Sequence, residues 1–268
     1  MPIAFCPLRS GSSGNSLFVS AGGANLLLDA GLSGKTVEEA LRAAGGNPSQ
    51  LCGILVSHEH SDHIKGVGVL SRRYDLPVYA TEKTWLAMES KPGMQNIALK
   101  NRRVFIANES FYIRNLAVTP FSIPHDAADP VGFALESDGR KLCVATDLGH
   151  IAKGWMTAVS GADLLLLESN HDPDMLFASE RYTSALKARI YGARGHLSND
   201  DCGKALVRLA ETGVRNVILG HLSQETNNPE LAFNTVCRTL CDNGIKPQED
   251  LRVDLAWRDR LGGYYEIG

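Results

Sequence analysis

The chain of 268 residues carries 27 Lys and Arg against 30 Asp and Glu, a formal net charge of −3, with 44% hydrophobic and 21% charged residues. This length excludes a disulfide-stabilised mini-protein, and the composition is that of a globular protein rather than a disordered chain. No apolar run approaches the roughly 20 residues of a transmembrane helix. The small acidic excess disfavours a protein that coats nucleic acid through a broad basic surface.

The amino-terminal segment Met1–Cys6 lacks the basic start and the apolar run of a secretory signal peptide. The chain has six cysteines, and none shows the paired short spacing of a zinc finger. We therefore expect reduced thiols that act as small apolar residues in a cytoplasmic protein. The sequence gives no sign of membrane contact or of an obligate protein partner.

The first part of the chain alternates short apolar strands with amphipathic helices, separated by Gly- and Ser-rich turns. The strands expected there are Ile3–Leu8, Leu17–Val19, Asn25–Asp29, Gly53–Ser57 and Pro77–Ala80. The helices expected there are Lys35–Ala44, His63–Tyr74 and one that begins at Glu82.

The middle of the chain is richer in strands, and the last part returns to alternation. The strands expected are Arg103–Ala107, Phe111–Asn115, Leu116–Ile123, Val131–Glu136, Lys141–Thr146, Ala162–Leu167, Asn216–Leu219 and Leu251–Trp257. The helices expected are Ser184–Tyr191, Asn199–Glu211 and Pro229–Cys241. With no linker or internal repeat, this pattern predicts one α/β (α+β) domain over residues 1–268. Its architecture would be a four-layer αββα sandwich of two mixed sheets with helices outside.

Three histidines and one aspartate follow the buried strand that ends near Ser57. They are His58, His60, Asp62 and His63. Neutral imidazoles and carboxylates are the usual ligands of borderline divalent ions. Four ligands in one loop exceed the three protein ligands of a typical catalytic zinc site, so the cluster predicts two adjacent ions.

Three further candidates stand at the carboxyl ends of apolar strands, as His58 does. They are His125, Asp147 and His221. A single such residue is usually structural, but several of them beside an unambiguous cluster favour a shared metal site.

The motif His58-x-His60-x-Asp62-His63, with Asp29 in Leu28-Asp29-Ala30-Gly31 and the later candidates, resembles the metallo-β-lactamase superfamily. This resemblance implies the αββα fold and a hydrolase with two divalent ions, zinc or manganese, with iron or nickel also acceptable. It implies one ion on His58, His60 and His125. It implies a second ion on Asp62, His63 and His221, with Asp147 bridging and Asp29 supporting the histidine loop from behind.

Two loops indicate the class of reaction. Glu168 follows a strand and His196 precedes a helix, and both loops resemble those of transfer-RNA 3′-processing enzymes of the superfamily. There the Glu orients the His, which protonates the leaving oxygen of a phosphodiester. We therefore expect Glu168, His196 and Asp62 to be catalytic, with a hydroxide shared by the two ions as nucleophile. Asp147 as the bridging ligand disfavours an antibiotic-hydrolysing lactamase.

The strings Ser10–Ser16, Glu168–Asp172 and Gly195–Asn199 resemble the YycJ/WalJ-like group. That resemblance implies an exonuclease that degrades double-stranded DNA from the 5′ end. The substrate contacts expected are Ser12, Ser13 and Asn15 in the Gly-rich turn, together with Asn170 and His171. The turn equally fits an ordinary hairpin. Arg181, Lys187, Arg189 and Arg194 before His196 fit either a substrate contact or a solvated helix face.

Several alternatives stay open on the sequence alone. A small-molecule or cyclic-nucleotide phosphodiesterase fits the same ligands. An RNA-processing nuclease is disfavoured because the short gap between His125 and Asp147 has no room for a long RNA-binding arm. An acyl hydrolase would use the same ions on thioesters or lactones. A purely structural metal site is disfavoured because such sites are closed by four ligands around one ion.

Overall fold

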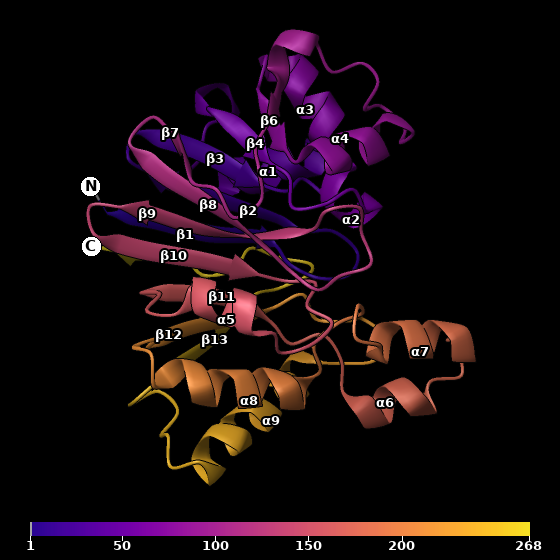
Figure 1. Cartoon of the computed structure of the whole chain (residues 1–268), viewed down its shortest axis with the longest axis vertical. Coiled ribbons are helices and arrows are strands. Elements are labelled where there is room, and N and C mark those ends of the chain that lie inside the picture. The colour runs from indigo at the N-terminus through magenta and orange to yellow at the C-terminus, as the bar shows by residue number, and fades with distance from the viewer. Residues whose placement is uncertain (1) are drawn as a thin grey trace.

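In the computed structural model, which describes residues 2–268, two sheets face each other and helices cover their outer sides (Figure 1). Met1, the first residue of the amino-terminal segment considered above, lies outside the described residues. Among residues 2–268 each sheet has seven strands, and both sheets combine antiparallel with parallel pairs. The four-layer αββα arrangement predicted from the sequence is confirmed.

The first sheet has the order β14 (Tyr265–Ile267), β1 (Ile3–Arg9), β2 (Ser16–Ala21), β3 (Ala24–Leu28), β4 (Gly53–Leu55), β5 (Val78–Ala80) and β6 (Arg102–Val104). The second sheet has the order β13 (Arg252–Leu255), β12 (Asn216–Gly220), β11 (Leu164–Glu168), β10 (Arg140–Ala145), β9 (Val131–Ser137), β8 (Leu116–Ser122) and β7 (Phe111–Ile113).

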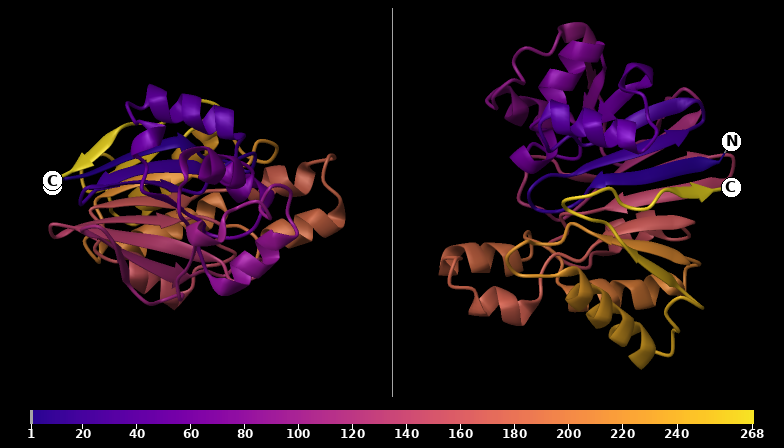
Figure 2. Two further views of the ribbon diagram at one scale, coloured as in Figure 1. Left: turned by 90° about the horizontal axis from the view of Figure 1, so that it is seen from above. Right: turned by 180° about the vertical axis from the view of Figure 1, so that it is seen from behind.

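The helices on the first sheet are α1 (Gly34–Ala43), α3 (Val67–Tyr74) and α4 (Glu82–Glu89), with the short α2 (Ser61–Ile64) at its edge. Those on the second sheet are α5 (Lys153–Val159), α8 (Asn199–Ala210) and α9 (Pro229–Asp242). Two 3₁₀ turns are η1 (Pro48–Gln50) and η2 (Leu99–Asn101). A helical hairpin of α6 (Pro173–Ala178) and α7 (Ser184–Tyr191) projects from the body (Figure 2).

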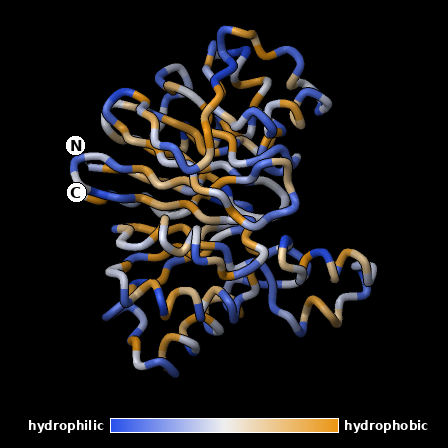
Figure 3. The backbone as a smooth tube through the Cα atoms, in the orientation of Figure 1, coloured by the Kyte–Doolittle hydropathy of each residue, from blue (hydrophilic) through white to orange (hydrophobic). Residues whose placement is uncertain are grey.

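Three apolar layers hold these elements together, one between the sheets and one under each outer set of helices. Strand β11 shows how the sequence creates them. Leu164 and Leu166 point into the layer between the sheets, whereas Leu165 and Leu167 point toward the outer helices. Because both faces are covered, the strand is a continuous leucine run rather than an alternating one (Figure 3). Each of these side chains contributes about 1.5–3 kcal/mol by burial.

The structure divides the helix expected over His63–Tyr74 into α2 and α3. The break lies at Gly66, whose N–H donates to the carbonyl of Ala30 at 2.7 Å. A Cβ at Gly66 would lie 2.5 Å from the carbonyl oxygen of Leu32, so the loop before α1 packs directly on this backbone. The break therefore lets the histidine loop and the loop after β3 share hydrogen bonds.

Two α-helices, two 3₁₀ turns and one strand were not predicted from the sequence: α5, α6, η1, η2 and β14. Strand β14 has only three residues, and it is a strand because it pairs with β1, as in Ile3 with Ile267. All six cysteines are free. Within residues 2–268, no helix combines the length and the apolar character needed to cross a membrane.

Candidate active site

The expected ligands meet at the edge where the carboxyl ends of the parallel strands lie. Asp29 directly follows β3, and the histidine loop follows β4 in the same sheet. From the other sheet, Asp147 follows β10, Glu168 ends β11 and His221 directly follows β12. Loops that leave the carboxyl ends of neighbouring parallel strands converge, so residues far apart in sequence become neighbours.

Three imidazole nitrogens converge at one point of this edge. Nδ1 of His60 lies 3.1 Å from Nε2 of His58 and 3.3 Å from Nε2 of His125. Burial, followed by the neighbouring imidazoles, lowers the pKa of His58 well below its usual range. A neutral ring whose Nε2 lies beside another imidazole nitrogen is suited to share a cation with it.

A second group lies beside the first. Nε2 of His63 is 3.5 Å from Oδ2 of Asp62, which is 3.7 Å from Nε2 of His221. Burial alone would lower the pKa of His63, but the carboxylates of Asp147, Asp29 and Asp62 overcome this and raise it to about 9. In the protein without metal, this ring is therefore an imidazolium that balances the surrounding carboxylates.

Asp147 lies between the two groups. Its Oδ1 is 3.6 Å from Nε2 of His125, and its Oδ2 is 3.4 Å from Nε2 of His63. Oδ2 of Asp147 and Nε2 of His221 are buried and have no hydrogen-bond partner in residues 2–268. Buried polar atoms normally have partners, and these two face the space between the groups. The residues present therefore fit divalent cations, with Asp147 placed to contact both.

The ring nitrogens that face away from the centre are held by acceptors. Nδ1 of His63 donates to Oδ2 of Asp29 at 2.7 Å, and Nδ1 of His58 lies 3.0 Å from Oγ of Ser57. Ser57 is in turn held by Asp29, which accepts from its N–H and its hydroxyl. Nδ1 of His125 donates to the carbonyl of Gly195 at 3.0 Å. Such contacts fix each ring so that Nε2 faces the centre.

Glu168 holds two histidines through one oxygen. Its Oε1 accepts from Nδ1 of His221 at 2.7 Å and from Nδ1 of His196 at 2.8 Å. Its Oε2 accepts from the N–H groups of Leu148 and Leu197 at 2.6 and 3.0 Å. Against the effect of burial, His196 and His221 lower the pKa of Glu168. Each of its two carboxylate oxygens thus accepts two hydrogen bonds. Glu168 therefore positions both rings and has no oxygen free to bind a metal ion.

Three site residues adopt left-handed backbone conformations. The φ angle is 58° at Asp29, 62° at Asp147 and 57° at His221. This region is uncommon for residues with a Cβ, although Asp and His tolerate it better than most. Each residue forms the turn at which its loop leaves the edge of the sheet, and this turn directs the side chain toward the candidate ligands.

Asn15 is buried beneath the site, and its side chain is occupied by its own loop. Oδ1 accepts from the N–H of Gly11, and Nδ2 lies 3.1 Å from the carbonyl of Gly11 and 3.2 Å from Nε2 of His63. The backbone N–H of Asn15 donates to the backbone carbonyl of Asp62, and the backbone carbonyl of Asn15 accepts from the N–H of Gly31. These contacts join the Gly-rich turn to the loops that carry the candidate ligands, so Asn15 holds these loops in place. Ser12 and Ser13 are the exposed residues of the turn.

Asn170 and His171, also expected near the substrate, are both buried. Nδ2 of Asn170 donates to the carbonyl of His221 at 2.9 Å, so this side chain holds the ligand loop. Neither ring nitrogen of His171 has a partner in residues 2–268, and its ring meets Tyr191 edge-on. Burial lowers the pKa of His171 to about 4. Neither residue lines the cavity over the ligands.

A cavity of about 370 Å³ opens directly over the ligands. One wall carries Ser12, His60, Ser61, Asp62 and Lys91, and the other carries Asp147, His196, His221 and the side chains Tyr182, Leu186, Arg189 and Ile190 next to or within α7. Of the four cations expected before His196, only Arg189 lines this cavity, and it is paired with Asp126. Arg194 instead donates to the carbonyl of His125 at 2.8 Å.

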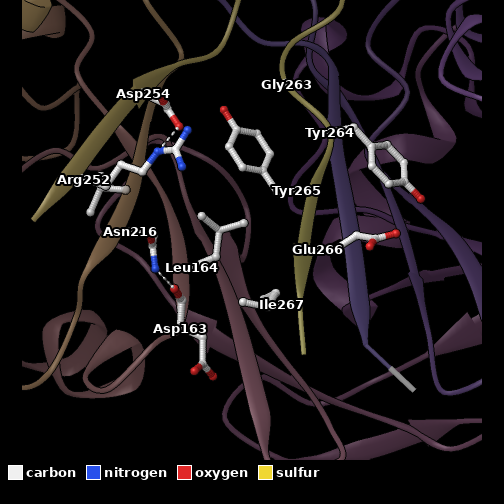
Figure 4. Close-up of a pocket in the computed structure, with 11 residues that line it drawn as sticks. Asp163, Leu164, Asn216, Arg252, Asp254, Gly263, Tyr264, Tyr265, Glu266 and Ile267 are labelled. Atoms are coloured by element: carbon white, nitrogen blue, oxygen red, sulfur yellow. Dashed lines mark hydrogen bonds and ion pairs between the residues drawn. The ribbon is translucent and has the colours of Figure 1, made fainter. Parts of the chain in front are cut away.

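A different cavity of about 440 Å³ lies at the opposite ends of the strands (Figure 4). It is lined by the amino-terminal residues of β11, β12 and β13 and by β14. Its charged residues include Arg252 and Asp254, which pair with each other at 3.2 Å. Within residues 2–268, no group of candidate metal ligands lies there, so the ligand-lined cavity is the candidate active site.

Some supporting residues were missed by sequence reasoning. Ser57 precedes the first histidine and holds the ring of His58, and the hydroxyl of Ser10 accepts from the N–H of His221 at 2.9 Å. Lys91 lines the cavity from the turn after α4. Ser57 could have been suspected because it adjoins the motif. Ser10 and Lys91 reach the site only through the fold.

The chain is similar to known proteins over most of its length. Residues 24–222 match the family described as a Beta-lactamase superfamily domain. Exodeoxyribonuclease YycJ of Bacillus anthracis is 41% identical over 253 residues, which are 94% of this chain and 95% of the relative. Exodeoxyribonuclease WalJ of Streptococcus pneumoniae is 37% identical over 246 residues, which are 92% of this chain and 91% of the relative.

Solved structures share the fold. Zn²⁺-bound PqqB from Methylobacterium extorquens has a TM-score of 0.73 and 19% identity, covering 98% of this chain and 100% of that one. A diphosphatase from the PhnP family has a TM-score of 0.65 and 19% identity, covering 100% and 98%. Human tRNase Z, short form, has a TM-score of 0.63 and 17% identity, covering 98% and 99%. At these identities the likeness concerns the fold alone.

Proposed function

Because the chain belongs to the β-lactamase superfamily, and within it to the family of the exodeoxyribonucleases YycJ and WalJ, we propose that it is a metal-dependent exonuclease. Its substrate is double-stranded DNA, degraded from the 5′ end. The observation that carries the proposal is the arrangement at Glu168. One buried carboxylate holds His221, a ligand candidate, and also His196, which lines the cavity. A side chain suited to protonate a leaving group thus lies beside the candidate ligands.

We propose two divalent ions, zinc or manganese. His58, His60 and His125 would hold one, Asp62, His63 and His221 would hold the other, and Asp147 would contact both. When bound, such ions polarise a phosphoryl group and lower the pKa of water. The carboxylates of Asp62 and Asp147 would supply negative charge to the bound ions. Asp29 holds His63 and Ser57 in place throughout.

His196 supplies the proton that the departing oxygen of a phosphodiester needs. Its Nδ1–H is engaged by Glu168, which leaves Nε2 on the opposite edge of the ring, on the side that lines the cavity. Water attacks phosphorus and loses a proton to the solvent, the P–O bond to the leaving nucleoside breaks, and the proton from Nε2 of His196 moves to that oxygen. His196 then takes up a proton from the solvent for the next cycle. A positioned general acid contributes about 10²–10⁴-fold in rate. Ser12 is exposed on the cavity wall, where its hydroxyl can donate to a phosphoryl oxygen.

The test is a comparison of substrates under defined metal loading. Purified protein is offered 5′-labelled linear duplex DNA, the corresponding single strand, RNA of the same sequence and a cyclic dinucleotide, each with Mn²⁺ or Zn²⁺. We expect mononucleotides released from the 5′ end of the duplex, and two ions per chain by metal analysis. Cleavage of the cyclic dinucleotide alone would replace DNA with a small diester as the substrate. Hydrolysis of thioesters without any diesterase activity would overturn the proposal.

A further inference from the structure

Another cavity, of about 490 Å³, adjoins the cavity over the candidate ligands. These two neighbours are called the second and the first cavity. The two share four lining residues, Ser12, Ser61, Asp62 and Lys91. The second cavity continues from there along Ser13, Lys65 and Pro92. A linear substrate placed over the ligands in the first cavity can therefore extend into the second.

The free positive charge of this region lies in the second cavity. Lys65 lines that cavity and Lys91 lines both, and in residues 2–268 neither ammonium group has an ion pair or a hydrogen bond. On the opposite wall, Arg189 is paired with Asp126, and nearby Arg181 is paired with Glu225. Of the Lys and Arg side chains that line the two cavities, only Lys65 and Lys91 therefore present to an anion a charge that no carboxylate balances.

The other lining groups also suit a phosphate. Among the described residues, Asp62 is the one carboxylate that lines the second cavity, and its Oδ2 is directed at His63 and His221 rather than at the lysines. Ser12 and Ser13 are exposed, so their hydroxyls can donate to phosphate oxygens. Gly31, Ile64 and Pro92 complete the lining without charge.

We propose that the second cavity is a subsite for the phosphate next to the scissile one, held by Lys65 and Lys91. This inference rests on the proposed phosphodiesterase function. It adds that the protein binds at least two consecutive phosphates of one strand. Ammonium groups bind phosphate oxygens as point charges without reading sequence, so the subsite favours chain length over base identity.

The experiment compares thymidine oligonucleotides that carry one phosphodiester, TpT, with those that carry two, TpTpT, using metal-loaded protein. In the wild type we expect KM to fall about tenfold when the second phosphate is added, the usual worth of a charge-assisted hydrogen bond. Lys65→Ala should lose most of this gain and leave kcat/KM on TpT unchanged. Lys83→Ala is the matched control, because Lys83 is exposed on α4 and lines neither cavity.

Binding is measured separately, by fluorescence anisotropy of a labelled thymidine tetranucleotide at several salt concentrations. Lys65→Glu should weaken binding and reduce the salt slope by about 0.7, because the variant neutralises one phosphate fewer than the wild type does. If Lys65 variants keep the wild-type dependence on length and the wild-type affinity, the subsite is wrong even when DNA is cut. If the wild type cuts neither these oligonucleotides nor the 5′-labelled duplex but Lys65→Glu still weakens binding, the subsite stands and the proposed nuclease function fails.

Discussion

Oδ2 of Asp29 accepts a hydrogen bond from Nδ1 of His63 at 2.7 Å, although the residues follow different strands of the first sheet. The same carboxylate accepts from the N–H and the hydroxyl of Ser57. One buried aspartate thus sets the tautomer of His63 and the start of the histidine loop.

Replacing Asp29 by Asn should weaken metal binding without unfolding the chain. The amide would present N–H groups to Nδ1 of His63 or to Ser57, both of which need an acceptor. We expect about 10–100-fold lower affinity at the group of Asp62, His63 and His221, the usual effect of losing such a partner. Competition with a chromogenic chelator measures it. Asp242→Asn, at an exposed position of α9, is the control, and equal affinities in the two variants would contradict the role of Asp29.

His196→Ala should keep both ions and lose about 10²–10⁴-fold in kcat on DNA, because the leaving nucleoside oxygen then departs without a proton donor. The loss should be much smaller on thymidine 5′-p-nitrophenyl phosphate, whose nitrophenolate leaves unprotonated. His60→Ala, by contrast, should lose one ion, because His60 faces both His58 and His125. Steady-state kinetics with metal analysis separate these cases. An equal loss on both substrates would show that His196 does not act as the acid.

Gly31→Ala should disrupt the site through the backbone alone. A Cβ at Gly31 would lie 1.6 Å from the carbonyl oxygen of Asp62, so the loop that bears the ligands must move. Gly154→Ala in α5 is the matched control, because a Cβ there meets no atom within 4 Å. We expect the first variant to lose metal and thermal stability. The second should gain up to about 1 kcal/mol from the greater helix propensity of Ala, and urea unfolding measures both.

Metal uptake should release protons from one ligand group more than from the other. At pH 8 His63, with a pKa of about 9, is protonated in the metal-free protein, and a metal must displace that proton. His58 and His125 have lowered pKa values and have no proton to displace. The metal affinity of the group of Asp62, His63 and His221 should therefore rise with pH up to about 9. Calorimetry in two buffers of different ionisation enthalpy counts the protons, and zero release at pH 8 would contradict the assignment.

The sequence predicted most of the fold because β11 and its neighbours are strongly apolar and end in recognisable turns. It also predicted which candidate ligands meet at one edge, because His58 to His63 lie within one loop and the others follow apolar strands. It failed where tertiary pairing decides, as for β14, and where a single close approach breaks a helix, as at Gly66. It could not show that Asn15 and Asn170 bind backbone atoms, because hydrogen bonding to a distant loop leaves no local pattern.

The candidate ligands are divided between the two sheets. The first sheet supplies the histidine loop, and the second supplies His125, Asp147 and His221. Each candidate group draws residues from both sheets, so each of the proposed ions would cross-link the two halves of the sandwich. Chelation should then loosen the molecule first along this edge, and amide hydrogen exchange should accelerate there while the apolar layer between the sheets stays protected.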